Sequence, residues 1–313
     1  MIYTENALNV LTALECKGIG PAWIYKNIRR GQDLRTIWKM ISYATKNFEL
    51  SYEIFLRKRN DIETLFNSEE CSLDGVVAYG DEDFPVVPDT VKGGERPVVL
   101  FYKGNISLLH KMDKNVAVVG VLNPEHGIEE RERAFVKALV TGGCNIVSGL
   151  AKGCDSISHK QALDSNGKTI AILPGTLKNI IPSENRLLSD EIVSKNGLLV
   201  TEYYKEASSK KELVDRYVKR DRLQAMFCKA ICLTASYAPN DQGNDSGSRH
   251  AMGKAKEYNR QRYVMYNPEI DHDNAQFDLN RELLKEASVR VISTKSIEEI
   301  CSFVLNRTTL FDL

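Results

Sequence analysis

The sequence predicts an α/β fold in which a mostly parallel, doubly wound sheet follows a small all-helical domain. From residue 116 onward, short and almost continuously apolar runs alternate with segments of helical periodicity. Parallel strands that are covered by helices on both faces have this pattern. Residues 1–70 show helical periodicity and little strand character instead. We therefore predict a Rossmann-like domain over residues 71–313, preceded by an N-terminal helical domain over residues 1–70.

The N-terminal segment contains one distinctive turn. Leu8, Leu11 and Leu14 fall on one face of a predicted helix, and the run K-G-I-G-P follows at residues 17–21. The turn is similar to that of SAM-like and helix-hairpin-helix domains, where backbone N–H groups can hold a DNA phosphate. A plain turn between two helices uses glycine in the same way, and we favour this second interpretation.

Two further strands, at residues 76–79 and 97–104, flank a loop rich in Pro and Gly. The strands expected in the parallel part of the sheet are Val116–Gly120, Asn145–Ser148, Thr169–Leu173, Leu198–Thr201, Ala230–Thr234, Arg262–Tyr266 and Val289–Ile292. The helices expected after them are Glu129–Val140, Ser156–Asp164, Ser183–Lys195, Asp221–Cys228, Arg249–Tyr258 and the closing helix Ser296–Leu305.

Composition limits the function. The 313 residues carry a formal net charge of zero, so a binding site for a polyanion must be a local concentration of Lys and Arg. Seven cysteines without a C-x-x-C pair indicate reduced thiols, and five scattered histidines indicate neither a metal site nor a cofactor. The first residues resemble no leader peptide, and no apolar run approaches the ~18 residues that span a membrane. We expect a soluble, cytoplasmic protein.

The stretch 142–155 is central to the functional prediction. It is typical of a strand, a tight turn and a helix start. At the carboxyl end of a parallel strand, such a turn presents backbone N–H groups and the positive end of a helix, which attract anions. Lys152 would add a full charge, and Gly149 and Gly153 would let a phosphate come close. The alternative is an ordinary turn with a solvated lysine.

Loops that follow other predicted strands should meet this turn at one edge of the sheet. These loops lie at residues 120–124, 174–176 and 246–249, and the basic run 219–222 lies just before the fifth strand. That run could instead be a solvated helix start. The candidate phosphate-binding residues are Gly120, Ser148, Gly149, Lys152, Gly153, Gly175, Arg220, Arg222, Ser246, Gly247, Ser248 and Arg249.

A catalytic role is not predicted. Asp155, Ser156 and His159 are neighbours on one predicted helix, whereas a catalytic triad brings its members together from different elements. Asp155 is better interpreted as a helix N-cap. Rossmann-like nucleotide phosphoribohydrolases have a catalytic glutamate shortly after a similar P-G turn. The run 174–179 has no glutamate.

Several motifs in order resemble the DNA-processing protein A family (DprA, also called Smf). They are G-D-x-x-F-P at 80–85, P-V-V-L-F-x-x-G at 97–104, S-G-L-A-K-G-C-D at 148–155, I-P-S-E-N-R at 181–186, R-D-R at 220–222 and S-G-S at 246–248. The resemblance runs from about residue 5 to about residue 300. It implies an extended Rossmann fold, a homodimer, binding of single-stranded DNA without enzymatic activity, and loading of a RecA-type recombinase during DNA processing in natural transformation.

The resemblance also assigns roles to individual residues. Lys152 stands where the family presents a cation to DNA, and Arg220, Arg222 and the turn 246–248 match further binding motifs. Leu122, however, stands where the family usually has a DNA-contacting arginine, and residues 240–245 add acidic and flexible positions. We therefore predict a single-stranded DNA-binding recombination mediator. A nucleotide-binding sensor in defence or stress signalling is the second interpretation, and an interaction scaffold without a ligand is the third.

Overall fold

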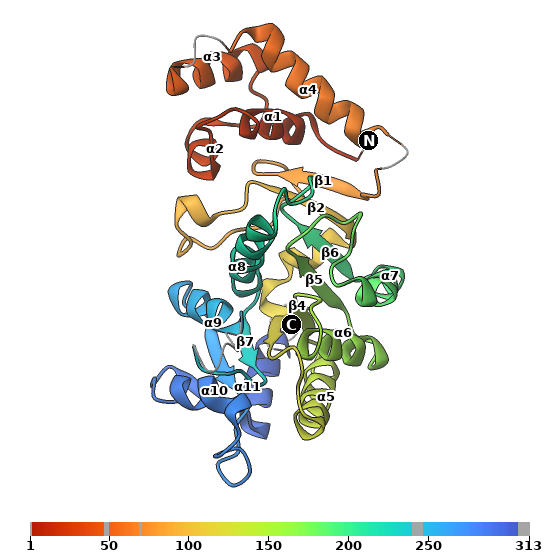
Figure 1. The fold of residues 1–313 in the computed structure, drawn as a ribbon, viewed down its shortest axis with the longest axis vertical. Helices are drawn as coiled ribbons and strands as arrows, with labels where there is room; N and C mark the ends of the chain where they lie inside the picture. Colours follow the sequence, from red (N-terminus) through yellow and green to blue (C-terminus); the bar gives the residue numbers. More distant parts are fainter. Residues whose placement is uncertain (1, 47–49, 69–70, 240–246, 306–313) are drawn as a thin grey trace, which may run out of the picture.

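In a computed structural model of the protein, four helices stand over one end of a nine-stranded sheet (Figure 1). The structure describes residues 2–46, 50–68, 71–239 and 247–305, with side chains as far as residue 302. Among the helices in these ranges, none is both long and apolar enough to cross a lipid bilayer.

The N-terminal helices form as the sequence predicts. They are α1 (Glu5–Leu14), α2 (Pro21–Asn27), α3 (Leu34–Thr45) and α4 (Tyr52–Phe66). Side chains of Thr4, Asp33 and Ser51 accept hydrogen bonds from the first turns of α1, α3 and α4, because N-terminal N–H groups have no partner within a helix. Gly18 adopts φ 89° in the turn before α2, a conformation that glycine tolerates best.

The helical part shares its core with the first two strands. Leu8 and Phe55 pack in one apolar cluster with Val76, Val99 and Phe101. A bridge between Tyr3 and Val76 extends the contact. The division of the chain near residue 70 therefore stays a prediction, because the boundary is crossed by a continuous core.

The sheet is mostly parallel, as predicted. Its strands are β1 (Gly75–Ala78), β2 (Val99–Gly104), β3 (Asn115–Val119), β4 (Asn145–Ser148), β5 (Thr169–Leu173), β6 (Leu198–Thr201), β7 (Ala230–Leu233), β8 (Gln261–Val264) and β9 (Val289–Val291). Their order is β1-β2-β6-β5-β4-β3-β7-β8-β9, and β2 runs opposite to both of its neighbours, β1 and β6, while all other neighbouring strands are parallel. The direction of winding reverses between β3 and β7, so this is the switch point where ligands bind in such sheets.

Helices cover both faces of the parallel strands (Figure 1). On one face lie α5 (His126–Thr141), α6 (Cys154–Asp164), α7 (Arg186–Ser194) and α11 (Thr294–Leu305), and on the other lie α8 (Lys210–Met226), α9 (Ser248–Glu257) and α10 (Asp278–Leu283). Val116 and Val118 of β3 pack toward the first set, and Ala117 and Val119 toward the second. This alternation explains why β3 is apolar at nearly every position.

Two helices differ from the prediction. Helix α8 begins at Lys210 and not at Asp221, and α10 was not predicted. The first half of α8 is mainly charged and exposed, so it carries little of the apolar periodicity from which a helix is predicted.

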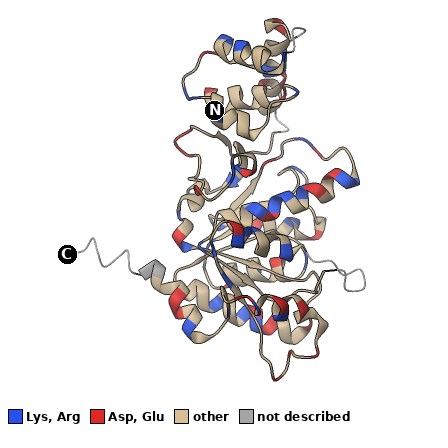
Figure 2. Ribbon diagram, turned by 90° about the vertical axis from the view of Figure 1, so that its left-hand side faces the viewer, with Lys and Arg blue, Asp and Glu red and all other residues tan. Residues whose placement is uncertain are grey.

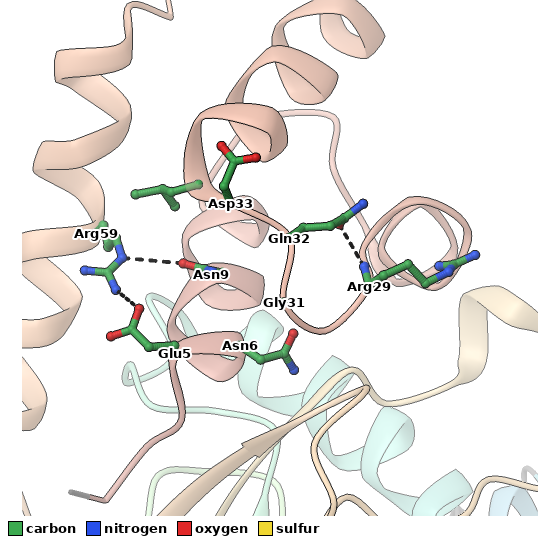
Figure 3. Close-up of a pocket in the computed structure, with 9 residues that line it drawn as sticks. Glu5, Asn6, Asn9, Arg29, Gly31, Gln32, Asp33 and Arg59 are labelled. Atoms are coloured by element: carbon green, nitrogen blue, oxygen red, sulfur yellow. Dashed lines mark hydrogen bonds and ion pairs between the residues drawn. The ribbon is translucent and has the colours of Figure 1, made fainter.

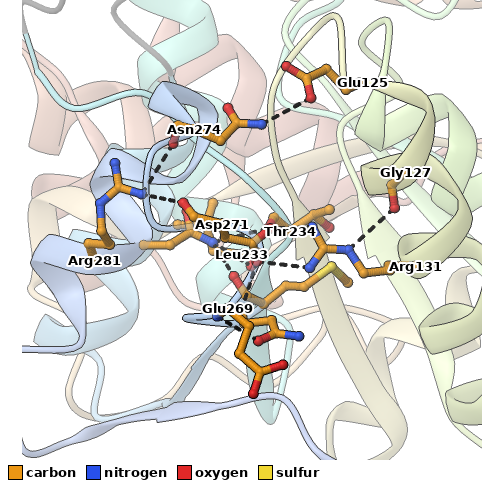
Figure 4. Close-up of polar contacts among 12 residues, drawn as sticks. Glu125, Gly127, Arg131, Leu233, Thr234, Glu269, Asp271, Asn274 and Arg281 are labelled. Atoms are coloured by element: carbon orange, nitrogen blue, oxygen red, sulfur yellow. Dashed lines mark hydrogen bonds and ion pairs between the residues drawn. The ribbon is translucent and has the colours of Figure 1, made fainter.

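A polar network fastens the segment before α10 to α5 (Figure 4). Both terminal nitrogens of Arg131 reach the carboxylate oxygens of Asp271 at 2.8 Å, and Asp271 also accepts a hydrogen bond from the backbone N–H of Asn267. Arg281 donates to the backbone oxygens of Asp271 and Asn274. Planar guanidinium groups suit such two-oxygen contacts, so the arginines hold a loop that has little regular structure.

We predict that Glu132 of α5 makes stability depend on pH. Glu132 is fully buried against α6, where it accepts a hydrogen bond from Ser158, and burial raises the pKa of its carboxyl group to about 8. Because this pKa lies above the ordinary 4.5, its stabilising contribution is present at acidic pH and is lost as pH rises through 8. The advantage of Glu132→Gln over the original protein in free energy of unfolding should therefore be larger at pH ~9 than at pH ~5, by about 4 kcal/mol.

Urea unfolding at both pH values measures this difference. Glu130→Gln changes an exposed glutamate of the same helix and should leave the pH dependence unaltered. A parallel pH dependence in the original and the Glu132→Gln proteins would show that the carboxyl group of Glu132 ionises normally.

Candidate nucleic-acid interface

The predicted loops meet at the carboxyl edge of the sheet. The hydroxyl of Ser248 donates to the backbone oxygen of Gly120 at 3.1 Å, and the side-chain amide of Asn185 donates to the backbone oxygen of Leu150 at 2.8 Å. The backbone N–H of Cys154 donates to Val121. We use the name rim for the loop residues 120–125, 149–153, 174–185 and 247–249, which these contacts bring together.

The β4–α6 turn requires glycine at residues 149 and 153 because a Cβ at either position would overlap other atoms of the protein. The requirement does not come from a bound phosphate. Gly153 has φ 69°, and a Cβ there would overlap the backbone oxygens of Val121 and Leu122. A Cβ on Gly149 would run into the guanidinium of Arg220. The space beside both glycines is therefore filled by the chain itself.

A carboxylate of the chain occupies the predicted anion position. Asp155 accepts hydrogen bonds from the backbone N–H groups of Gly149 and Ala151, both at 3.2 Å. It is the second residue of α6 and not the N-cap that the sequence predicts, since Gly153 takes that place. Burial raises the pKa of Asp155, while the charge of Arg220 opposes the rise. A phosphate must consequently approach the outer side of this turn.

Lys152 lies on that outer side. Its side chain is 55% exposed, and its ammonium group pairs with the carboxylate of Glu184, which is 60% exposed. The structure thus places the predicted cation at the surface of the rim, with an acidic partner that the sequence does not suggest.

Arg220 and Arg222 are buried, with 5% and 4% of their surfaces exposed. Arg220 lies between Asp155 and Asp221 and donates to the backbone oxygen of Ile172. Arg222 makes two 2.7 Å hydrogen bonds to Glu202. The run 219–222 is thus not a solvated helix start, because it lies in the second half of α8, whose inner side contacts the sheet. A phosphate contact by either arginine stays a prediction.

The other predicted residues mainly hold loops. Ser148 is buried and donates to the backbone oxygen of Val118, and the backbone oxygen of Gly175 accepts a hydrogen bond from Thr201. Gly247 is the exposed N-cap of α9, and Arg249 is half-buried in its first turn. Ser246 lies outside the described residues.

Protein side chains fill the crevice at the switch point. Val121 and Phe277 are buried there in one apolar cluster. Gln276 spans the crevice, because its amide nitrogen donates to the backbone oxygen of Asn123 at 3.1 Å and to the hydroxyl of Tyr237 at 3.3 Å. The place where related folds bind a nucleotide is therefore occupied. Leu122, 58% exposed, stands at its border.

Asp155, Ser156 and His159 have separate partners. Ser156 donates to the backbone oxygen of Ala151, and the ring of His159 contacts the hydroxyl of Thr169 at 2.6 Å. Burial lowers the pKa of His159 to about 3, so this imidazole is neutral at physiological pH. These three side chains do not form a proton relay.

The described residues form neither a cluster that could hold a metal ion nor a disulfide. Within the described ranges, no three His, Cys, Asp or Glu side chains gather where they could hold a metal ion. All seven cysteines are described, and all are unpaired thiols.

Two cavities lie away from the switch point. One, of about 320 Å³, is lined by polar residues of the helical part, including Asn9, Arg29 and Arg59 (Figure 3). The other, of about 340 Å³, is a groove between α6 and α7 that includes Glu184 and Asn185. Sequence reasoning missed the role of these last two residues, although the motif at 181–186 contains both.

Comparison with known proteins assigns the family. The sequence model described as DNA recombination-mediator protein A matches residues 75–304. The chain belongs to this family. Smf of Synechocystis sp. is 29% identical over 81% of this chain and 63% of its own length. DprA of Bacillus subtilis is 35% identical over 37% of this chain and 38% of its own length. The chain thus spans less than two thirds of these DprA relatives.

Solved DprA structures share the fold. The structure of DprA from Streptococcus pneumoniae has a TM-score of 0.67 at 23% identity, covering 93% of this chain and 92% of that one. DprA from Helicobacter pylori, described with a unique single-stranded DNA binding mode, has a TM-score of 0.58 at 25% identity, covering 74% of this chain and 96% of that one. The extended Rossmann-like fold predicted from the sequence is confirmed.

We predict that Arg222 contributes to stability through its ion pair with Glu202. Arg222→Ala would leave the carboxylate of Glu202, with 11% of its side chain exposed, without its guanidinium partner. Breaking a buried ion pair in this way should lower the free energy of unfolding by about 3 kcal/mol. Lys219→Ala, one turn away on the exposed side of α8, should change it by less than about 0.5 kcal/mol. Urea unfolding compares the two. A fully stable Arg222→Ala protein would place this side chain at the surface.

Proposed function

We propose that the protein is a single-stranded DNA-binding recombination mediator that holds the phosphate backbone along the outer side of the rim. The observation that carries the proposal is the exposed Lys152 on the β4–α6 turn, in a chain that belongs to a recombination-mediator family. The solved Helicobacter relative, whose description names single-stranded DNA, supports it. The proposal includes homodimer formation, delivery of a RecA-type recombinase and the absence of a catalytic step.

The proposed strand path uses a small number of cations. Lys152 and Lys219 are exposed, and Arg249 is half-buried at the start of α9. Figure 2, which faces the side of α8, α9 and α10 in Figure 1, shows Lys and Arg interspersed with Asp and Glu along the helices, as expected for a protein without net charge. Arg220 and Arg222 are assigned a supporting role in this proposal, because they hold α8 beneath the rim.

One observation supports the alternative function of a nucleotide-binding sensor. The exposed Leu122 supplies an apolar surface where the family usually presents an arginine. A mononucleotide would, however, have to displace Gln276 and Phe277 from the switch point. A strand that follows the surface of the rim requires no such rearrangement, so the structure favours DNA.

We predict that the protein prefers single strands to duplexes and does not distinguish sequences. The rim offers cations and backbone groups to phosphates but inserts no helix into a groove. Fluorescence anisotropy with labelled single strands of different sequence, their duplexes and a labelled mononucleotide tests this. Equal affinity for strand and duplex would contradict the proposal, and tight binding of the mononucleotide alone would favour the sensor.

We predict that Lys152→Ala weakens binding to every single strand by a similar factor. Loss of one phosphate contact should reduce the slope of log affinity against log salt concentration by ~0.7. Lys195→Ala removes another exposed, ion-paired lysine at the end of α7 and serves as the control. Salt titrations measure both variants. Unchanged affinity and slope in Lys152→Ala would remove this residue from the binding site.

A further inference from the structure

We propose that Glu184 is an internal competitor for the phosphate at Lys152 and thereby favours polynucleotides over mononucleotides. This inference rests on the proposed function and assigns a specificity-determining residue to the same site. The ammonium group of Lys152 lies 2.5 Å from Oε1 of Glu184, in the position that a phosphate oxygen would take.

The position of Glu184 is built into the fold. The next residue, Asn185, donates through its side-chain amide to the backbone oxygens of Leu150 and Ala151 and to the hydroxyl of Ser156. These three bonds attach the short helix Ser183–Asn185 to the β4–α6 turn. The backbone of Glu184 is consequently fixed close to Lys152, and this fixed position brings the two side chains together.

The charges also favour competition. The hydrogen bond from Lys152 and its positive charge hold the pKa of Glu184 below its ordinary value, so the carboxylate is ionised at neutral pH. On the inner side of the same turn, Asp155 already occupies the backbone N–H groups of Gly149 and Ala151. Both features of this turn that attract anions therefore hold a carboxylate of the chain.

Displacement of Glu184 has a different consequence for short and long ligands. Both groups are more than half exposed, so the ion pair is weak and a phosphate can replace it. A mononucleotide has a single phosphate group with which to offset the displacement. A strand also contacts Lys219 and Arg249 in the proposed path, so part of its affinity does not depend on the displacement of Glu184.

Glu184→Gln tests the proposal. At low salt it should raise the affinity for labelled oligothymidine about two- to fivefold, in proportion to the typical strength of an exposed ion pair, and the gain should shrink at high salt. The labelled mononucleotide should gain by a larger factor than the strand, which would narrow the preference for strands, and equal factors for the two ligands would contradict the proposed selectivity. Glu191→Gln removes the same charge from α7, where Glu191 pairs with Lys195 at 2.8 Å, and should change neither affinity.

A double-mutant cycle separates competition from general repulsion. In the Lys152→Ala background, Glu184→Gln should bring a clearly smaller gain than in the original protein. Equal gains in both backgrounds, or an equal gain from Glu191→Gln, would overturn competition at Lys152. If strands bind and Lys152→Ala weakens them while Glu184→Gln has no effect, only this inference fails. If the original protein binds no strands, the proposed function fails with it.

Discussion

The carboxylate of Asp155 is the constraint on which the shape of the rim depends. It satisfies two backbone N–H groups of the β4–α6 turn and faces Arg220, whose guanidinium fills the space over Gly149 and reaches the end of β5. On its other side Arg220 faces Asp221, which lies beside Gly247 at the start of α9. One buried arginine of α8 thus joins the β4–α6 turn to β5, and Asp221 beside it reaches the start of α9. An isolated buried charge would be very unfavourable, so these groups depend on one another.

Because of this arrangement, a phosphate can bind only on the outer surface of the rim. The interior positions that would attract a phosphate are satisfied by the chain, and the switch point is closed by Gln276 and Phe277. Exposed cations such as Lys152 remain on the rim. A neutral protein can in this way offer a polyanion a narrow site, whose affinity is set by a few cations and by the carboxylates beside them.

Local sequence patterns predicted the sheet, because most strands of its parallel part, such as β3, β5 and β7, are short apolar runs. The glycine at residue 153 was also predictable, since the turn requires its φ angle. The environment of Arg220 and Arg222 was not, because their partners Asp155 and Glu202 come from distant parts of the chain. A run of charges looks solvated until these partners are known. The pairing of Lys152 with Glu184, 32 residues away, was hidden for the same reason.

The central claim is that a strand contacts Lys152 on the outer side of the rim while the arginines below remain buried. Chemical acetylation of lysines, with and without oligothymidine, tests it most directly when each site is quantified by mass spectrometry. The account predicts that DNA protects Lys152 and leaves Lys195 as reactive as before, because Lys195 lies at the far end of α7. Equal acetylation of Lys152 in the presence and absence of saturating DNA would contradict the account.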